Sequence, residues 1–195
     1  METSLGQARL VLASGSPRRR DLLAHFGIPF AVVPSGADET ANGTGRTQVA
    51  ALARRKGADV FTRHAHLPVL AADTLVCLDD QVLGKPTDEA DARRMLRALS
   101  GRWHSVHTGV CLHVPGGAVL ERVETTRVRF AKLDEAAIAR YVATGEPMDK
   151  AGAYAVQDIG GIFVERIEGS PSNVIGLPLA TVAALLTAAG LIQGE

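Results

Sequence analysis

Short apolar runs alternate along the chain with segments whose apolar residues recur at helical spacing. The apolar runs predict strands because they are short and end at glycine, proline or aspartate. The predicted strands cover residues 10–13, 30–33, 67–78, 105–114, 119–130 and 161–164. One predicted helix begins at Pro17 and another follows a cap at Thr87. Further helices are predicted over residues 47–64, 134–143 and 177–189. This order predicts a three-layer α/β fold, and the tight Gly116-Gly117 turn makes its sheet mixed.

The run over residues 67–78 predicts a central strand covered on both faces, yet it contains Asp73. A lone ionised carboxylate inside such a strand would cost several kcal/mol. Asp73 is therefore a candidate general base or ligand of a hard divalent cation. The alternative is a structural ion pair with Lys56 or an arginine. Thr74 would point to the opposite face of the strand.

Charge and composition limit the classes of partner. The chain has 195 residues, with 21 lysines and arginines against 21 aspartates and glutamates. No overall field attracts nucleic acid or an anionic membrane, so any anion site has to be local. Cys77 and Cys111 lie in apolar runs, as free thiols of a reducing compartment do, and the alternative is a disulfide between them. We expect one domain over residues 1–195, cytoplasmic, with no leader, membrane span or nucleic-acid partner.

The first predicted helix has three arginines in its first turn, in the stretch SGSPRRR. Ser16 suits the N-cap, but Arg18 and Arg19 oppose the positive end of the helix dipole. Arg19 also shares the apolar stripe of the helix, at the end of the first strand, where α/β folds bind ligands. The stretch predicts a phosphate or triphosphate cradle of backbone N–H groups with Ser14, Ser16, Arg18 and Arg19. The alternative is a solvated basic turn paired with Asp21.

Three further segments carry weaker signals. Lys85 in LGKP could be an ordinary surface lysine, and Asp38 with Glu39 could be a solvated loop or a pair of metal ligands. In DKAGAYAVQ, Lys150 suits phosphate and the amide of Gln157 suits a base edge, although glycine-rich loops are more often plain turns. The P-loop, the dinucleotide fingerprint, the nucleophile elbow of α/β-hydrolases and a zinc set of histidines are all missing from the sequence.

Several stretches together resemble the successive motifs of the Maf family of nucleoside triphosphate pyrophosphatases. They are LASGSPRRRDLL, AADTLV, LGKPTDEADARRMLRALSGRWHSVHTGV, GEPMDKAGAYAVQ and GSPSNVIGLPL, which extend from Leu10 to Leu179. The resemblance implies an α/β fold of two lobes around a central cleft. It also implies hydrolysis of a nucleoside triphosphate to the monophosphate and pyrophosphate with Mg²⁺ or Mn²⁺. The DKAGAY motif with its glutamine resembles the branch acting on dTTP and UTP, and the family is associated with house-cleaning of nucleotides, arrest of cell division and dimers.

The resemblance also implies roles for individual residues. It implies that Asp73 is the proton acceptor and that Glu39 shares metal binding or water activation. The phosphate ligands it implies are Ser14, Arg18, Arg19, Lys56 and Lys85, and the residues tied to base preference are Arg18, Thr74 and Gln157. Three positions depart from the subgroup, namely Ala155, Asp158 and Pro171. The substrates could include modified pyrimidine nucleoside triphosphates. The competing hypotheses are a Maf enzyme with another base preference, a phosphatase that releases orthophosphate, and a nucleotide sensor of cell division that binds without turnover.

Overall fold

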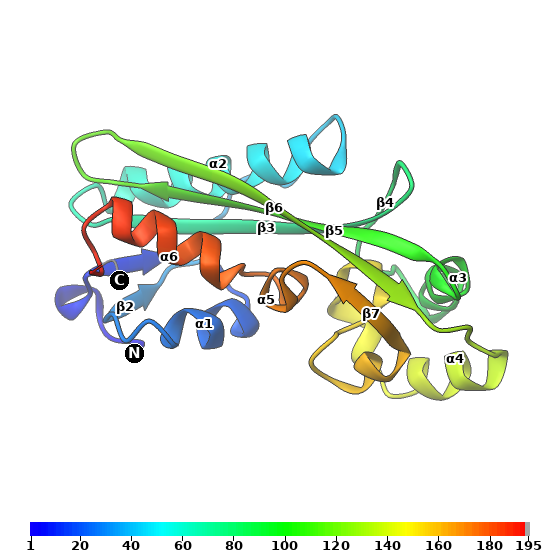
Figure 1. Cartoon of the computed structure of the whole chain (residues 1–195). Helices are drawn as coiled ribbons and strands as arrows, with labels where there is room; N and C mark the ends of the chain where they lie inside the picture. Colours follow the sequence, from blue (N-terminus) through cyan, green and yellow to red (C-terminus); the bar gives the residue numbers. More distant parts are fainter. Residues whose placement is uncertain (194–195) are drawn as a thin grey trace. The chain divides into compact units, whose positions relative to one another are not determined.

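The computed structural model describes residues 1–193 as alternating strands and helices (Figure 1). The strands are β1 (Leu10–Leu12), β2 (Phe30–Val32), β3 (Val69–Leu78), β4 (Gln81–Leu83), β5 (Trp103–His113), β6 (Val119–Phe130) and β7 (Val164–Glu168). The helices are α1 (Pro17–Ala24), α2 (Gly45–Arg63), α3 (Glu89–Leu99), α4 (Glu135–Val142), α5 (Pro171–Ile175) and α6 (Leu179–Ala188). Short 3₁₀ helices are η1 (Leu5–Gln7), η2 (Glu146–Asp149), η3 (Ala151–Ala153) and η4 (Ile159–Phe163). None of the helices in this described part is both long and apolar enough to cross a bilayer.

The strands form one mixed sheet, as the sequence predicts. Its order is β2-β1-β3-β5-β6-β7, with β4 paired to β3. β1 runs parallel to both β2 and β3, whereas β4 is antiparallel to β3 and β7 is antiparallel to β6. The chain divides into two compact units, and β3, β5 and β6 each contribute residues to both. Unit 1 comprises residues 1–73, 108–124 and the described residues from 176 onward; unit 2 comprises 74–107 and 125–175.

Unit 1 has three layers because β1 is buried on both faces. Leu10 and Leu12 face one way and pack with Leu23 of α1 and Leu185 of α6. The alternate residues, Val11 and Ala13, join an apolar cluster with Val60 of α2, and similar clusters cover both faces of the neighbouring strand. The predicted run of apolar residues without alternation is explained by this double cover.

Helix α2 lies unusually close to the strand beneath it. Its first turn is capped by Thr44, whose hydroxyl accepts a hydrogen bond from the N–H of Thr47. Gly109 of β5 faces this part of the helix, and a Cβ placed there would lie 2.2 Å from the carbonyl oxygen of Val49. The backbones of strand and helix therefore meet only because residue 109 is glycine.

Unit 2 has its own core, built around aromatic rings. Helices α3 and α4 pack over buried residues of β3, β5 and β6. His104 lies edge-on to both Phe130 and Tyr154, and its Nε2 is 2.8 Å from the Tyr154 hydroxyl. Phe130 also contacts Phe163, which meets Tyr141 at a right angle. This cluster fixes the irregular segment 146–163 against the sheet.

Several predicted boundaries were wrong, for local reasons. Asp88, not Thr87, caps α3, because its carboxylate accepts from the N–H of Asp91 at 2.8 Å. Helix α6 begins after Pro178 rather than at Leu177, since the residue before a proline disfavours helical angles. Residues 161–163 of the strand predicted over 161–164 form the end of η4, and β7 starts at Val164. The elements β4 and α5 and the short 3₁₀ helices were not predicted.

Candidate functional site

The loop between β1 and α1 folds back on itself through two serines. Ser16 caps α1 as predicted, accepting from the N–H of Arg19 at 3.5 Å. Ser14 is buried, and its Oγ accepts from the N–H of Ser16 at 3.2 Å and from Nη1 of Arg19 at 3.3 Å. The predicted cradle residues Ser14 and Arg19 therefore lie together.

Arg19 is directed into unit 1 and not into solvent. Its Nε donates to the carbonyl oxygen of Gly176 at 2.9 Å. Burial lowers the pKa of the Arg19 guanidinium, and nearby Arg18 lowers it further, while the charges of Asp73 and Glu39 raise it. The alternative of a basic turn paired with Asp21 applies instead to Arg20, whose Nε lies 3.2 Å from that carboxylate.

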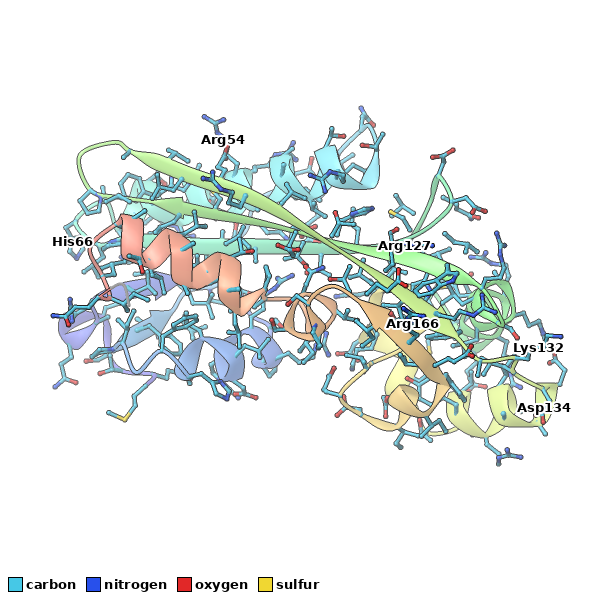
Figure 2. The ribbon with its side chains drawn as sticks, viewed as in Figure 1. Arg54, His66, Arg127, Lys132, Asp134 and Arg166 are labelled. Atoms are coloured by element: carbon cyan, nitrogen blue, oxygen red, sulfur yellow. The ribbon has the colours of Figure 1, made fainter. Side chains whose placement is uncertain are left out.

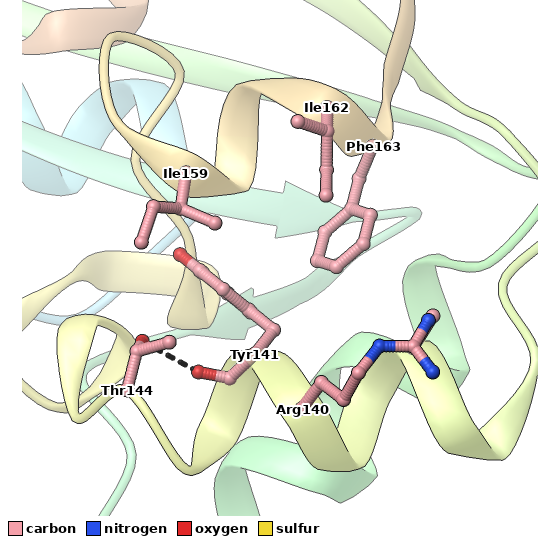
Figure 3. Close-up of a pocket in the computed structure, with 7 residues that line it drawn as sticks. Arg140, Tyr141, Thr144, Ile159, Ile162 and Phe163 are labelled. Atoms are coloured by element: carbon pink, nitrogen blue, oxygen red, sulfur yellow. Dashed lines mark hydrogen bonds between the residues drawn. The ribbon is translucent and has the colours of Figure 1, made fainter.

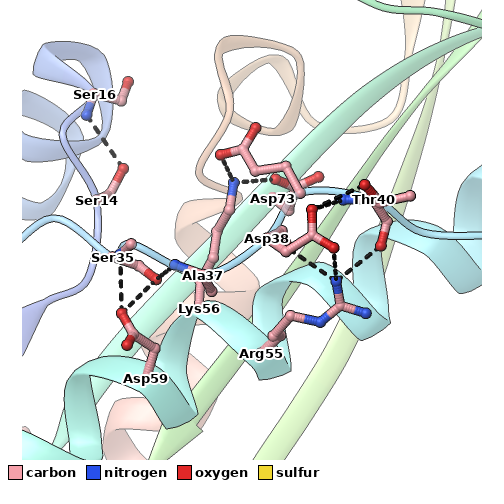
Figure 4. Close-up of polar contacts among 12 residues, drawn as sticks. Ser14, Ser16, Ser35, Ala37, Asp38, Thr40, Arg55, Lys56, Asp59 and Asp73 are labelled. Carbon is pink, nitrogen blue, oxygen red and sulfur yellow. Dashed lines mark hydrogen bonds and ion pairs between the residues drawn. The ribbon is translucent and has the colours of Figure 1, made fainter.

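Lys56 and Asp73 form the centre of the site (Figure 4), and Glu39 contacts Lys56 as well. The Nζ of Lys56, on α2, lies 2.7 Å from Oδ1 of Asp73 on β3 and 2.7 Å from Oε1 of Glu39. The side chains of Lys56 and Asp73 are only 11% and 10% exposed, whereas that of Glu39 is 73% exposed. The ion pair of Asp73 with Lys56, which was the alternative to a catalytic role, is present. Glu39 joins it as a second carboxylate.

The segment that carries Glu39 is held by side chains of α2. The carboxylate of Asp59 accepts from the hydroxyl of Ser35 at 2.8 Å and from the N–H of Gly36 at 2.9 Å. Nη1 of Arg55 donates to the carbonyl oxygens of Asp38 and Thr40, each at 2.8 Å. Two polar residues of α2, Arg55 and Asp59, therefore hold the segment that places Glu39 against Lys56.

Asp38 does not join the pair. Its Oδ1 accepts from the N–H and the hydroxyl of Thr40, at 3.0 and 2.8 Å, and these hydrogen bonds lower the pKa of Asp38. Sequence reasoning did not identify Arg55 and Asp59 as supports of this segment. Their signal was their spacing around Lys56, which places all three near one face of α2.

The donors at this site suit a hard divalent cation. Among residues 1–193 no group of three or more histidines, cysteines or carboxylates could hold a metal by itself. Mg²⁺, however, is commonly bound by one or two carboxylates that leave further positions to water and substrate phosphates. Asp73 and Glu39 supply two such carboxylates, and the ammonium of Lys56 already occupies a cation's place between them.

Four more of the predicted site residues belong to unit 2, namely Thr74, Lys85, Lys150 and Gln157. Lys85 is exposed, and Lys150 forms an ion pair with its neighbour Asp149. The amide of Gln157 donates to Oδ2 of Asp158 at 2.9 Å, so one of the three departures from the subgroup pattern contacts the amide directly. Thr74 follows Asp73 inside β3, which continues to Leu78.

Two polar residues of unit 2, Asn173 and Glu146, have structural contacts. Nδ2 of Asn173 is buried and donates to the carbonyl oxygen of Val106 and to Oγ1 of Thr126, each at 3.0 Å. The carboxylate of Glu146 accepts from the N–H groups of Ile159 and Gly160, at 3.1 and 3.0 Å. Glu146 thereby fixes the start of η4, just after Gln157 and Asp158.

A separate pocket in unit 2 has different chemistry (Figure 3). Its volume is about 210 Å³, and its lining residues are Ala137, Arg140, Tyr141, Thr144, Ile159, Ile162 and Phe163. Arg140 is the one charged member of this lining, and no carboxylate is present to accept a proton. The pocket therefore lacks the parts needed for phosphate hydrolysis, which the cluster around Lys56 has.

Comparison with known proteins agrees with the motifs. A dTTP/UTP pyrophosphatase of Anaeromyxobacter sp. strain Fw109-5 is 55% identical over 188 residues, covering 93% of this chain and 90% of that protein. A dTTP/UTP pyrophosphatase of Methylobacillus flagellatus is 46% identical over 191 residues, covering 96% of each. The structure of a HAM1 protein from Coxiella burnetii shares the fold, with a TM-score of 0.51 at 20% identity, over 93% of this chain and 99% of that one. Residues 9–189 match the family described as Maf-like protein, and the chain belongs to that family.

Proposed function

We propose that this protein hydrolyses dTTP and UTP to the nucleoside monophosphate and pyrophosphate. The observation that carries the proposal is the cluster of Arg19, Lys56, Asp73 and Glu39 in unit 1, which combines partly buried cations with a buried carboxylate. The relatives that bear the name dTTP/UTP pyrophosphatase support the same reaction and the same bases.

The cations bind the triphosphate in this proposal. Arg18 and Arg19 lie in the first turn of α1, where the helix dipole also favours an anion. Ser14 and Gly176 hold the guanidinium of Arg19, so its orientation is set before the substrate arrives. Lys85 and Lys150 are further phosphate ligands by their place in the motifs. Such preorganised cations stabilise the negative charge that accumulates on the leaving pyrophosphate.

Asp73 acts as the general base. Its carboxylate takes a proton from a water molecule, the water oxygen forms a bond to the α-phosphorus, and the bond between that phosphorus and the bridging oxygen breaks. Pyrophosphate leaves with that oxygen. A divalent cation bound by Asp73 and Glu39 would supply neutralisation of charge on the phosphate oxygens. Arg18, Thr74 and Gln157 are the residues proposed to set base preference.

A nucleotide panel tests the reaction. Purified protein is incubated with each common nucleoside triphosphate and Mg²⁺ or Mn²⁺, and monophosphate, pyrophosphate and orthophosphate are separated by chromatography. We expect equal amounts of monophosphate and pyrophosphate, with dTTP and UTP as the best substrates. Release of orthophosphate would instead identify a phosphatase, and saturable binding without turnover would identify a sensor.

A further inference from the structure

Lys56 makes two contacts that a phosphate ligand does not need. Its ammonium lies 2.7 Å from a carboxylate oxygen of Asp73 and 2.7 Å from one of Glu39. These are the two carboxylates proposed to hold the divalent cation, so the inference rests on the proposed function. Lys56 thus occupies, in the nucleotide-free protein, the position between the oxygens that the cation requires.

The ammonium and the cation cannot share these oxygens. A bound Mg²⁺ lies about 2.1 Å from each carboxylate oxygen it contacts, which is within the space that the Nζ of Lys56 fills. Like charges at such short range repel strongly where solvent is largely excluded, and both Lys56 and Asp73 are nearly buried. One of the two cations has to leave for the other to enter.

The two contacts of Lys56 differ in how easily they break. Glu39 is 73% exposed, so its ion pair with Lys56 is well screened by water and weak. Asp73 is 10% exposed, and without a cation its buried charge would be uncompensated. Entry of a divalent cation supplies that compensation, which leaves the ammonium free to turn toward an anion.

We infer that Lys56 is an internal competitor of the divalent cation: it holds Asp73 and Glu39 together in the nucleotide-free enzyme and is displaced when the cation binds. The displaced ammonium then becomes available to the phosphates of the nucleotide. Lys56 would therefore lower the affinity for free cation and couple cation binding to substrate binding.

Binding of Mn²⁺ to nucleotide-free protein tests the inference without any turnover. Free Mn²⁺ is measured by electron paramagnetic resonance during titration of wild type, Lys56→Met and Arg54→Met. We expect Lys56→Met to lower the Kd for Mn²⁺ about tenfold, because the competing charge is gone. Arg54 is the matched control. It lies on the outer face of the same helix (Figure 2), is 62% exposed and contacts Glu121 instead of either metal ligand.

The control separates competition from general electrostatics. If removal of any cation from α2 strengthens Mn²⁺ binding, Arg54→Met and Lys56→Met will lower the Kd equally, and the inference is wrong. An unchanged Kd in Lys56→Met, or no Mn²⁺ binding by that variant, overturns it as well. None of these results depends on the nucleotide panel, so pyrophosphate release with an unchanged Kd would leave the proposed function in place.

A second measurement uses the wild-type protein, in case Lys56→Met does not fold. The intact protein is treated briefly with acetic anhydride at increasing Mn²⁺ concentrations, and acetylation of each lysine is read by peptide mass spectrometry. We expect the labelling rate of Lys56 to rise and saturate with Mn²⁺, while that of exposed Lys132 stays constant. Labelling of Lys56 that does not respond to Mn²⁺ would show that the ammonium is not displaced.

Discussion

In unit 1 the ammonium of Lys56 and the carboxylate of Asp73 lie 2.7 Å apart and nearly buried, whereas in unit 2 the buried polar pair of His104 and Tyr154 is uncharged. Burial lowers the pKa of His104 to about 4 and raises the pKa of Tyr154, so both rings are neutral at neutral pH. Two ion pairs of unit 2, Arg97 with Glu135 and Arg102 with Asp79, are exposed to solvent on both sides.

The comparison of the two units shows that a buried ion pair lies in unit 1, whereas the buried pair of His104 and Tyr154 in unit 2 is neutral. Replacement of a buried ion pair by apolar residues is often neutral or stabilising, so such a pair is weak evidence for a role in stability. Unit 2 shows that the same fold can bury polar rings without ionising them. The ionic cluster of unit 1 is therefore best explained by chemistry, and three substitutions test that explanation.

The largest effect is expected from Asp73→Asn, which removes the proton acceptor and keeps the shape. We expect kcat to fall about a thousandfold, since general bases contribute at this scale. The fold should survive because Glu39 remains as a partner for Lys56. Initial rates of pyrophosphate release, with circular dichroism melts, measure both. Asp79→Asn, an exposed carboxylate paired with Arg102, is the control; a kcat within tenfold of wild type in Asp73→Asn would exclude Asp73 as the base.

The next effect concerns the neutral pair of unit 2. The pKa of His104 is about 4 in the folded protein, below the ordinary value of 6.5 that holds after unfolding. As the pH falls, the unfolded chain therefore protonates at His104 before the folded protein does. The contribution of His104 to the free energy of unfolding is fully present above pH 6.5 and is lost as the pH drops toward 4. This group accounts for a loss of about 3 kcal/mol in the free energy of unfolding across that interval.

His104→Phe tests this expectation because it keeps a ring in the aromatic cluster and removes the titrating group. Between pH 7 and 4.5, the free energy of unfolding measured in urea should fall less steeply with pH in the variant. The difference in slope should correspond to nearly one proton bound on unfolding. Its kcat at pH 7.5 should match wild type. An identical decline in both proteins would mean that folding does not lower the pKa of His104.

The smallest of the three effects is expected from Arg19→Lys, which keeps the charge and removes the planar guanidinium. Lysine cannot reproduce the contacts with both Gly176 and Ser14, so the cation is no longer oriented. We expect kcat/KM to fall about thirtyfold, the scale of a charged hydrogen bond. Arg20→Lys, on the exposed side of the same helix turn, should change kcat/KM less than twofold by comparison. Equal effects of the two substitutions would show that only the charge at residue 19 matters.

Local sequence patterns made several elements of the fold and parts of the candidate site predictable. The cap at Ser16, the buried β1 and the apolar run around Asp73 each follow from short patterns, and the structure has all three. The predicted antiparallel component also follows from a local signal, the glycine turn between β5 and β6. The family motifs added the reaction, which no single local pattern specified.

The rest depends on contacts between distant segments. Arg19 and Gly176 are 157 residues apart in the chain, so nothing near either residue reveals their hydrogen bond. Asp38 and Glu39 are adjacent and both acidic, and only the hydrogen bonds of Arg55 and Thr40 turn one of them away from Lys56. Strand β4 was missed because three residues after a turn carry too little pattern to predict a strand.

Gly109 touches none of the residues proposed to bind or react with the nucleotide, yet the carbonyl of Val49 leaves it no room for a Cβ. Any other amino acid there would push back the helix that carries Arg55, Lys56 and Asp59. In a genetic screen, a codon change at residue 109 would be recovered among the null alleles, although it lies outside the site. The position of the catalytic residues on α2 thus depends on the absence of a side chain at residue 109 of β5.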